Sequence, residues 1–223
     1  MLDCQEIAPN TDRPQAAVIW MHGLGADAND FVPIVPHLDC PNVRFVFPNA
    51  PVRRVTINAG YAMRAWYDIR TFDRVPDREN GDHIREATTE ITALIDRELA
   101  RGLPPERVFL AGFSQGAAMA HFVGLRETRT LGGIVVLSGY LVLEDTLAAE
   151  RHSANAATPM FFGHGAFDDV VLPDLGRAAF EAVQDGRPAE WHTYPMAHSV
   201  HPEQIAHLRD WLHARLSALE SNG

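Results

Sequence analysis

The sequence contains few cysteines and no long hydrophobic run, and each absence excludes a class of protein. Only two residues are cysteine, Cys4 and Cys40, which is too few for the disulfide framework of a small secreted domain. Neither lies in a turn that would present its thiol or lower its pKa, so we expect two free thiols and no cysteine nucleophile. No apolar run approaches the roughly 18 residues of a membrane-spanning helix, so we expect no stable membrane insertion.

Positive charge is also scarce. The chain has 19 Lys and Arg residues against 29 Asp and Glu, a formal net charge of −10, which disfavours nucleic acids and anionic membranes as partners. The amino-terminal segment lacks the basic and apolar regions of a secretory signal, so we expect a cytoplasmic protein. His198 and His201 could face one metal ion, but no further ligands follow at a recognisable spacing, so we predict no metal site.

The 223 residues suit a single α/β domain spanning 1–223. Short apolar or alternating runs predict buried strands over 16–22, 43–48, 107–112, 132–139, 159–165 and 189–195. Helical spacing, as at Ile84, Ala87, Ile91, Leu94, Ile95 and Leu99, predicts helices over 83–102, 114–125, 172–184 and 201–219. Gly176 is a weak point inside the third of these helices. The alternation predicts a mostly parallel central sheet with helices on both faces.

Residues 53–81 show no clean hydrophobic period. They are rich in Arg, Asp, Pro and Gly, with aromatic residues interspersed. We interpret this segment as a long surface excursion, which could serve as a partial lid.

A tight turn between a predicted strand and a predicted helix carries the first catalytic candidate. The residues Gly112-Phe113-Ser114-Gln115-Gly116 fit the G-x-S-x-G nucleophile elbow, which requires that context. Side chains two residues either side of Ser114 would clash in so tight a turn, which explains the two glycines. The turn raises the Ser114 hydroxyl above the sheet and places the N–H of Gln115 at a helix N-terminus, where negative charge is stabilised. The alternative is a purely structural turn.

A serine nucleophile needs a base, and the base needs an acid that orients it. Asp168 follows the strand predicted over 159–165, and His198 follows the strand predicted over 189–195. This Ser, Asp, His order is that of α/β-hydrolases. Asp168 would hold the imidazole through Nδ1, and His198 would take the Ser114 proton through Nε2.

Other side chains compete for these roles. Asp169 is adjacent to Asp168 and could be the acid, because the register cannot be fixed from propensity. His201 could rival His198, but His201-Pro202 is typical of the entry to a helix. We interpret His164 as a satisfied residue at a strand end.

The segment His22-Gly23-Leu24-Gly25 follows the first predicted strand. Loops at this place in the fold donate the second N–H of the oxyanion hole. We therefore predict that the amides of Leu24 and Gln115 form the hole together. The alternative is a glycine-rich turn with no catalytic duty.

With these residues in hand, the sequence resembles the small carboxylesterase, lysophospholipase and acyl-protein thioesterase family of α/β-hydrolases. The resemblance runs from about residue 15 to 213. It rests on HGLGADANDF (22–31), FPNAP (47–51), VTINAG (55–60), MRAWYDI (63–69), GFSQGAAMA (112–120), LSGYL (137–141), PMFFGHGAFDDVV (159–171) and YPMAHSV (194–200). Together these blocks are far more specific than any single motif.

The resemblance implies an α/β-hydrolase fold with Ser114, Asp168 and His198 as the catalytic triad. It favours Asp168 over Asp169, because the family's acid falls three residues after the glycine that aligns with Gly165. It also implies the oxyanion pair of Leu24 and Gln115. Five side chains that flank the motifs could line an apolar acyl groove or be ordinary core residues: Met63, Trp66, Tyr67, Leu141 and Val170.

The expected activity is hydrolysis of a small-molecule carboxylic ester through an acyl-enzyme, by a monomer or homodimer that needs no cofactor. Within the class, the alternative is a thioesterase or lysophospholipase acting on longer acyl chains. A dienelactone-hydrolase-like enzyme would carry cysteine at the elbow, and Ser114 argues against it. The remaining alternative is a non-catalytic binding protein on a hydrolase fold, against which the complete triad argues.

Overall fold

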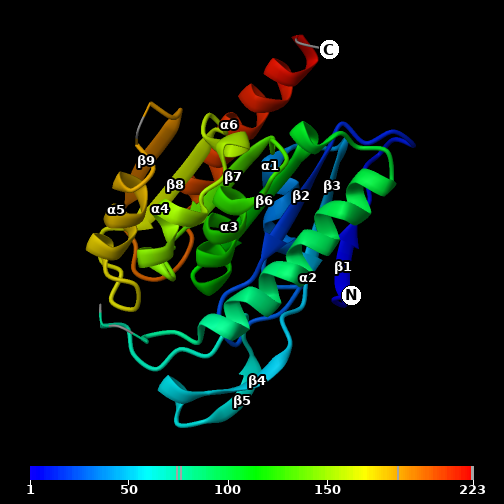
Figure 1. Ribbon diagram of the computed structural model, residues 1–223. Coiled ribbons are helices and arrows are strands. Elements are labelled where there is room, and N and C mark those ends of the chain that lie inside the picture. The colour runs from blue at the N-terminus through cyan, green and yellow to red at the C-terminus, as the bar shows by residue number, and fades with distance from the viewer. Residues whose placement is uncertain (74, 76, 185, 222–223) are drawn as a thin grey trace.

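A central seven-stranded sheet organises the computed structural model, which describes residues 1–73, 75, 77–184 and 186–221. The strand order is β1-β3-β2-β6-β7-β8-β9 (Figure 1). These strands are β1 (Cys4–Ile7), β2 (Ala16–Met21), β3 (Val43–Pro48), β6 (Val108–Phe113), β7 (Gly133–Leu137), β8 (Met160–Gly165) and β9 (Ala189–Tyr194). Only the β1–β3 pair is antiparallel among these neighbours. The predicted mostly parallel sheet is confirmed.

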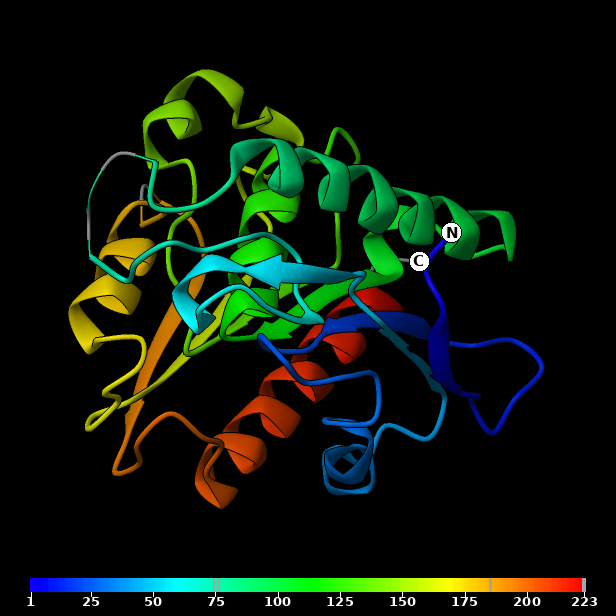
Figure 2. The same ribbon diagram turned by 90° about the horizontal axis from the view of Figure 1, so that it is seen from below.

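Helices cover both faces of the sheet, as the view from below shows (Figure 2). One face carries α2 (Gly81–Ala100), α3 (Gln115–Arg126), α4 (Leu147–Glu150) and α5 (Pro173–Glu181), and the other carries α1 (Val35–Leu38) and α6 (Pro202–Ser221). Short 3₁₀ helices span Val32–Ile34, Thr56–Asn58, Pro105–Arg107, Glu144–Thr146 and Ser153–Asn155. Each face buries its own hydrophobic cluster. The α/β-hydrolase architecture expected from the sequence is confirmed.

The central predicted strands form because their apolar runs are buried on both sides. All six residues of β2 and of β8 are buried, which is typical of central parallel strands between two helical layers. The helix predicted over 83–102 begins slightly earlier. The side chain of Asn80 accepts a hydrogen bond from the N–H of His83 and caps the first turn of α2.

Part of the segment predicted as a surface excursion lies in the core. Its first half forms an antiparallel hairpin of β4 (Val52–Val55) and β5 (Tyr61–Arg64), which projects below the main sheet in Figure 1. The chain then turns inward, and Trp66 and Tyr67 have no exposed surface. The prediction of a surface segment is therefore wrong for these two residues, because tertiary contacts rather than a local period bury them. Positions 74 and 76 of the excursion lie outside the described residues.

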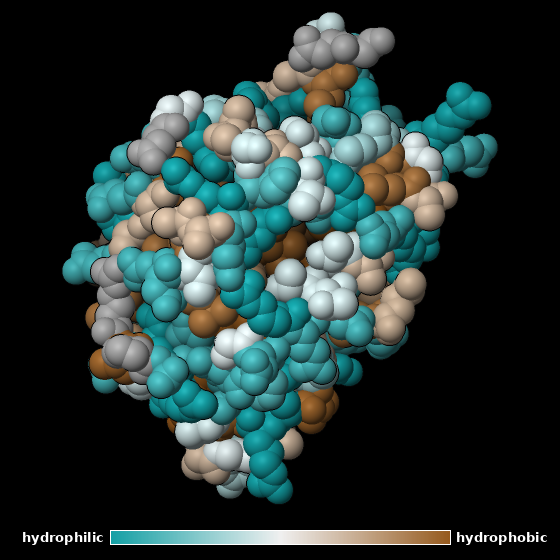
Figure 3. All heavy atoms as spheres, in the orientation of Figure 1, coloured by the Kyte–Doolittle hydropathy of each residue, from teal (hydrophilic) through white to brown (hydrophobic). Residues whose placement is uncertain are grey.

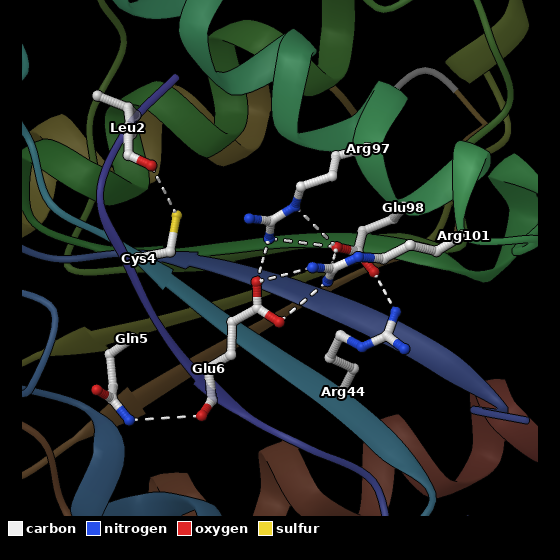
Figure 4. Close-up of polar contacts among 8 residues, drawn as sticks. All are labelled: Leu2, Cys4, Gln5, Glu6, Arg44, Arg97, Glu98 and Arg101. Carbon is white, nitrogen blue, oxygen red and sulfur yellow. Dashed lines mark hydrogen bonds and ion pairs between the residues drawn. The ribbon is translucent and has the colours of Figure 1, made fainter. Parts of the chain in front are cut away.

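A cluster of ion pairs joins the edge strand β1 to helix α2 (Figure 4). The fully buried carboxylate of Glu98 contacts Arg44 of β3 at 2.5 Å and Arg101 at 3.0 Å. Glu6 of β1 contacts Arg97 at 2.8 Å and Arg101 at 3.0 Å. These contacts pair buried charges that would otherwise destabilise the folded state. They also attach β1 to α2.

The surface visible in Figure 3 is mostly hydrophilic, with hydrophobic residues in small separate groups. No helix in the described part of the chain is long and apolar enough to cross a membrane. Cys4 and Cys40 are both free, as predicted. Burial raises the pKa of the Cys40 thiol to about 11, so it is a poor nucleophile at neutral pH.

Candidate active site

Ser114 sits in a strained turn between β6 and α3. Its φ of 55° and ψ of −119° fall in a region that residues with a side chain rarely adopt. A Cβ on Gly112 would lie 2.3 Å from the carbonyl of Gly116, and one on Gly116 would lie 2.2 Å from the carbonyl oxygen of Met21. The two glycines therefore allow the turn to close and to pack against the end of β2, as the sequence reasoning expected.

A chain of hydrogen bonds runs from Ser114 through His198 to Asp168. The Oγ of Ser114 lies 2.9 Å from Nε2 of His198, and Nδ1 of His198 lies 2.8 Å from Oδ2 of Asp168. These side chains follow β6, β9 and β8, and the carboxyl ends of these parallel strands bring them to one edge of the sheet. The geometry lets Asp168 orient an imidazole that can accept the serine proton.

The carboxylate of Asp168 is buried and fully engaged. Its Oδ1 accepts hydrogen bonds from the N–H groups of Val170 at 3.1 Å and Val171 at 2.8 Å. Burial by itself raises the pKa of Asp168, but the hydrogen bond and charge of His198 and these two N–H donors hold that pKa below its ordinary value. Asp168 is therefore ionised at neutral pH. The neighbouring Asp169 is exposed, so the structure brings Asp168, and not Asp169, onto His198.

His164 lies behind the acid. Its Nε2 is 2.9 Å from the carbonyl oxygen of Val171, to which it donates, and 3.6 Å from Oδ2 of Asp168. Its ring stacks on Trp191 with centroids 5.8 Å apart. The sequence predicts His164 only as a satisfied strand-end residue, whereas in the structure it also supports the loop that carries Asp168.

The region around His198 contains one residue as predicted and one that the sequence reasoning missed. His201 directly precedes α6, and its Nδ1 accepts a hydrogen bond from the N–H of Glu203, as expected for a helix entry. The ring of Phe113, inside the elbow, packs against the His198 imidazole at a centroid distance of 4.8 Å. This contact limits how the imidazole can tilt, and no hydrophobic periodicity around Phe113 indicates it.

The two candidate oxyanion donors lie at the ends of neighbouring strands. Leu24 follows β2 and Gln115 opens α3, and β2 pairs with β6 up to Met21 and Gly112. Among the described residues, neither the N–H of Leu24 nor that of Gln115 donates to a protein acceptor. Unengaged N–H groups of this kind are the donors that a developing oxyanion would require.

His22 fixes the loop that carries Leu24. Its Nε2 accepts a hydrogen bond from the N–H of Ala50 at 3.1 Å, so its proton is on Nδ1, which donates to the carbonyl oxygen of Gly23 at 2.6 Å. Burial lowers the pKa of His22, so the ring is neutral at pH 7. His22 therefore acts on the shape of the loop and does not itself face the reacting atoms.

The five predicted acyl-groove residues do not form one surface. Trp66 and Tyr67 are in the core, and the hydroxyl of Tyr67 contacts that of Tyr140 at 2.5 Å. Leu141 is also buried. Met63 is half-buried beside the oxyanion loop, and Val170 is exposed next to the acid.

Two further apolar side chains lie near Val170 on the loop that carries Asp168, and the three residues Phe167, Val170 and Leu172 are called the apolar rim below. Phe167 is 70% exposed and Leu172 is 56% exposed. These two side chains were not among the predicted groove residues. Their position on either side of a conspicuous Asp-Asp pair, directly after a strand end, is the signal that could have found them.

The arrangement can support acyl transfer by an activated serine. No group of three or more His, Cys, Asp or Glu side chains in the described ranges is placed to hold a metal ion. The reacting groups that are present are a hydroxyl, an imidazole, a buried carboxylate and two unengaged amides, which suit attack on a carbonyl carbon.

Comparisons with known proteins agree with this geometry. The family model of phospholipases and carboxylesterases matches residues 2–216. The chain is 33% identical to acyl-protein thioesterase 1 of Yarrowia lipolytica, over 88% of this chain and 90% of that protein. It is 32% identical to the carboxylesterase SOBER1 of Arabidopsis thaliana, over 92% of each. The crystal structure of SOBER1 superposes with a TM-score of 0.84 at 31% identity, covering 90% of this chain and 99% of that one.

Proposed function

Since the chain belongs to the phospholipase/carboxylesterase family and is a carboxylic ester hydrolase, we propose that Ser114 is its nucleophile. In this proposal His198 acts as general base and then as general acid, and Asp168 orients His198. One observation carries the proposal. The serine, imidazole and carboxylate form an unbroken hydrogen-bonded chain, with distances of 2.9 and 2.8 Å, at the carboxyl edge of the sheet.

The proposed reaction has two halves. The Oγ of Ser114 attacks the acyl carbonyl while His198 takes the hydroxyl proton, and the negative charge of the tetrahedral intermediate rests on the amides of Leu24 and Gln115. His198 then gives the proton to the leaving alcohol or thiol, which leaves an acyl ester on Ser114. Water attacks this ester with His198 as base, and the acid and the free serine result. No step requires a cofactor.

Replacing the base tests this mechanism. We expect His198→Ala to lower kcat for a p-nitrophenyl ester by several orders of magnitude, because the serine then lacks a proton acceptor, while thermal unfolding changes little. The control is His201→Ala, which alters a neighbouring histidine outside the hydrogen-bonded chain. Turnover near that of the wild type in His198→Ala would contradict the proposal.

Acyl-thioester hydrolysis is the second candidate activity, because the chain is 33% identical to a protein named acyl-protein thioesterase. The apolar rim of Phe167, Val170 and Leu172 beside Asp168 supports a preference for substrates with a longer acyl chain over substrates with a short acyl group. Initial rates on p-nitrophenyl esters and on acyl thioesters of increasing chain length separate the two. A rate that peaks with short esters supports a carboxylesterase, and one that rises with long thioesters supports a thioesterase.

We further propose that the enzyme is cytoplasmic and works as a monomer or homodimer. Fractionation of the producing cells tests the first statement, and light scattering of the purified protein tests the second. A membrane-bound or secreted protein, or a larger assembly, would contradict them.

A further inference from the structure

Trp66 is bonded to both segments that carry the candidate oxyanion donors. Its backbone N–H donates to Oε1 of Gln115 at 2.7 Å, and its indole Nε1–H donates to the carbonyl oxygen of His22 at 2.9 Å. It has no exposed surface. One residue from the segment after β5 thus spans the ends of β2 and β6, and its two donors bond to the segments that follow these two strands.

At the elbow, both polar atoms of the Gln115 side-chain amide form hydrogen bonds. Besides accepting from Trp66, the amide donates through Nε2 to the carbonyl oxygen of Tyr67 at 2.8 Å. The side chain is buried, so these bonds are not exchanged for bonds to water. The residue whose backbone N–H faces the reacting carbonyl is therefore held by its own side chain against residues 66–67.

At the other side, the loop after β2 is held at two points by the same segment. The carbonyl of His22 accepts from the Trp66 indole, and the N–H of Gly25 donates to the carbonyl oxygen of Arg64 at 2.8 Å. Leu24 lies between these two points. The pairing of β2 with β6 ends at Met21 and Gly112, so beyond the sheet the bonds from residues 64–67 link Leu24 to Gln115.

We propose that Trp66 is a positioning residue that sets the spacing between the N–H groups of Leu24 and Gln115. The inference rests on the proposed function, since it takes these two amides as the oxyanion hole. An oxyanion hole works because its donors are already aimed when charge develops. A link that fixes both donors relative to each other therefore contributes to the transition state and little to substrate binding.

The substitution Trp66→Phe tests the link, because it keeps an aromatic ring but removes the indole N–H. Removing an oxyanion donor outright costs about 100-fold to 1,000-fold in kcat, so misplacing one is expected to lower kcat by about tenfold to a hundredfold, with KM changed less than about threefold. The matched control is Trp211→Phe. Trp211 is also buried but packs against Gly133 at the amino end of β7, away from the site.

Two readouts separate positioning from general loss of structure. The first is a trifluoromethyl ketone. Ser114 Oγ bonds to its carbonyl carbon, His198 takes the proton and the carbonyl oxygen becomes an oxyanion. Its affinity should fall by the same factor as kcat/KM. The second is the rate ratio of an oxoester to its thionoester, whose sulfur is a poor hydrogen-bond acceptor. That ratio should fall in Trp66→Phe and stay constant in Trp211→Phe.

Unchanged ketone affinity and an unchanged oxoester-to-thionoester ratio in a folded Trp66→Phe protein would overturn the inference. An equal fall of both in Trp211→Phe would also overturn it. If Trp66→Phe does not fold, Gln115→Met removes the two side-chain hydrogen bonds that join Gln115 to residues 66–67, which is the other end of the link between the two donors. The same two readouts then decide. If the wild type itself neither turns over esters nor binds the ketone, the proposed function fails first, so the two failures are distinguishable.

Discussion

Gly176 has no side chain at the point where helix α5 meets the ring of His164. A Cβ on Gly176 would lie 2.2 Å from Nδ1 of His164 and 2.5 Å from its Cε1. The sequence made this glycine a weak point in the helix. The structure gives the reason for it, because the glycine leaves room for a histidine that supports the loop carrying Asp168.

Gly176→Ala should therefore destabilise the protein although alanine favours helix by about 1 kcal/mol. We expect a loss of about 1–3 kcal/mol in the free energy of unfolding, as for an overpacked core, and a lower kcat because the displaced His164 ring disturbs Asp168. Denaturant unfolding and ester kinetics measure both. In the control Gly81→Ala, the new Cβ meets Leu143 at an ordinary 3.4 Å; an equal loss there would contradict the explanation.

Asp168→Asn should lower kcat by about 10⁴-fold with little change in KM, because an amide in this place favours the wrong tautomer of His198. Asp169→Asn is the matched control, since its carboxylate is exposed and adjacent. The measurement is kcat and KM of both variants on one p-nitrophenyl ester. If Asp169→Asn loses activity and Asp168→Asn does not, the acid has been assigned to the wrong residue.

The buried His121 makes stability depend on pH. Burial lowers its pKa to about 3, with the charges of Arg187 and Arg126 acting in the same direction. Because the folded-state pKa lies below the unfolded one, the stability contributed by neutral His121 is complete above about pH 6.5 and is lost as the pH falls. The slope from one such group is at most about 1.4 kcal/mol per pH unit.

His121→Leu removes this contribution. We expect its unfolding free energy to fall less steeply than that of the wild type between pH 6.5 and pH 4. Urea unfolding at several pH values measures the slopes, and a substitution at the exposed His37 should leave the wild-type slope intact. Equal slopes in the wild type and His121→Leu would show that His121 is not the group responsible.

Glu98→Gln should destabilise the fold by about 3–5 kcal/mol, because it removes the buried carboxylate that pairs with Arg44 and leaves Arg101 paired with Glu6 alone. Glu86→Gln breaks a pair with Arg53 in which the glutamate is 63% exposed, and should cost less than about 1 kcal/mol. Chemical denaturation compares the two. A cost for Glu98→Gln as small as that of Glu86→Gln would mean that the cluster in Figure 4 contributes little.

The part of the fold that can be predicted from the sequence is the part with a clear local pattern of apolar residues. Apolar runs that end at glycine or proline placed β3 at its observed bounds and β2 within one residue. The edge strand β1 was not predicted, because a four-residue half-buried strand has too little pattern to stand out. Helix α2 shows the limit most clearly: Leu99 is only half-buried, whereas Glu98 is fully buried by arginines from β3 and α2 that no local window contains.

The candidate site divides in the same way. Strand ends and chain order pointed to Ser114, Asp168 and His198, because parallel strands bring their carboxyl ends to one edge. The residues alone left Asp169 open, and only burial and the contact with His198 distinguish the two carboxylates in the structure. The sequence left Trp66 open between an acyl groove and the core, and it could not show that Trp66 bonds to the loop after β2 and to the start of α3, because these neighbours in space are about 45 residues away along the chain.

The identity of the nucleophile is tested most directly by labelling with a fluorophosphonate, which phosphonylates only an activated serine. The account predicts one adduct per chain on the peptide containing Ser114, located by mass spectrometry, and none in Ser114→Ala. Absence of labelling in active wild-type enzyme, an adduct on another residue, or equal labelling of Ser114→Ala would contradict it.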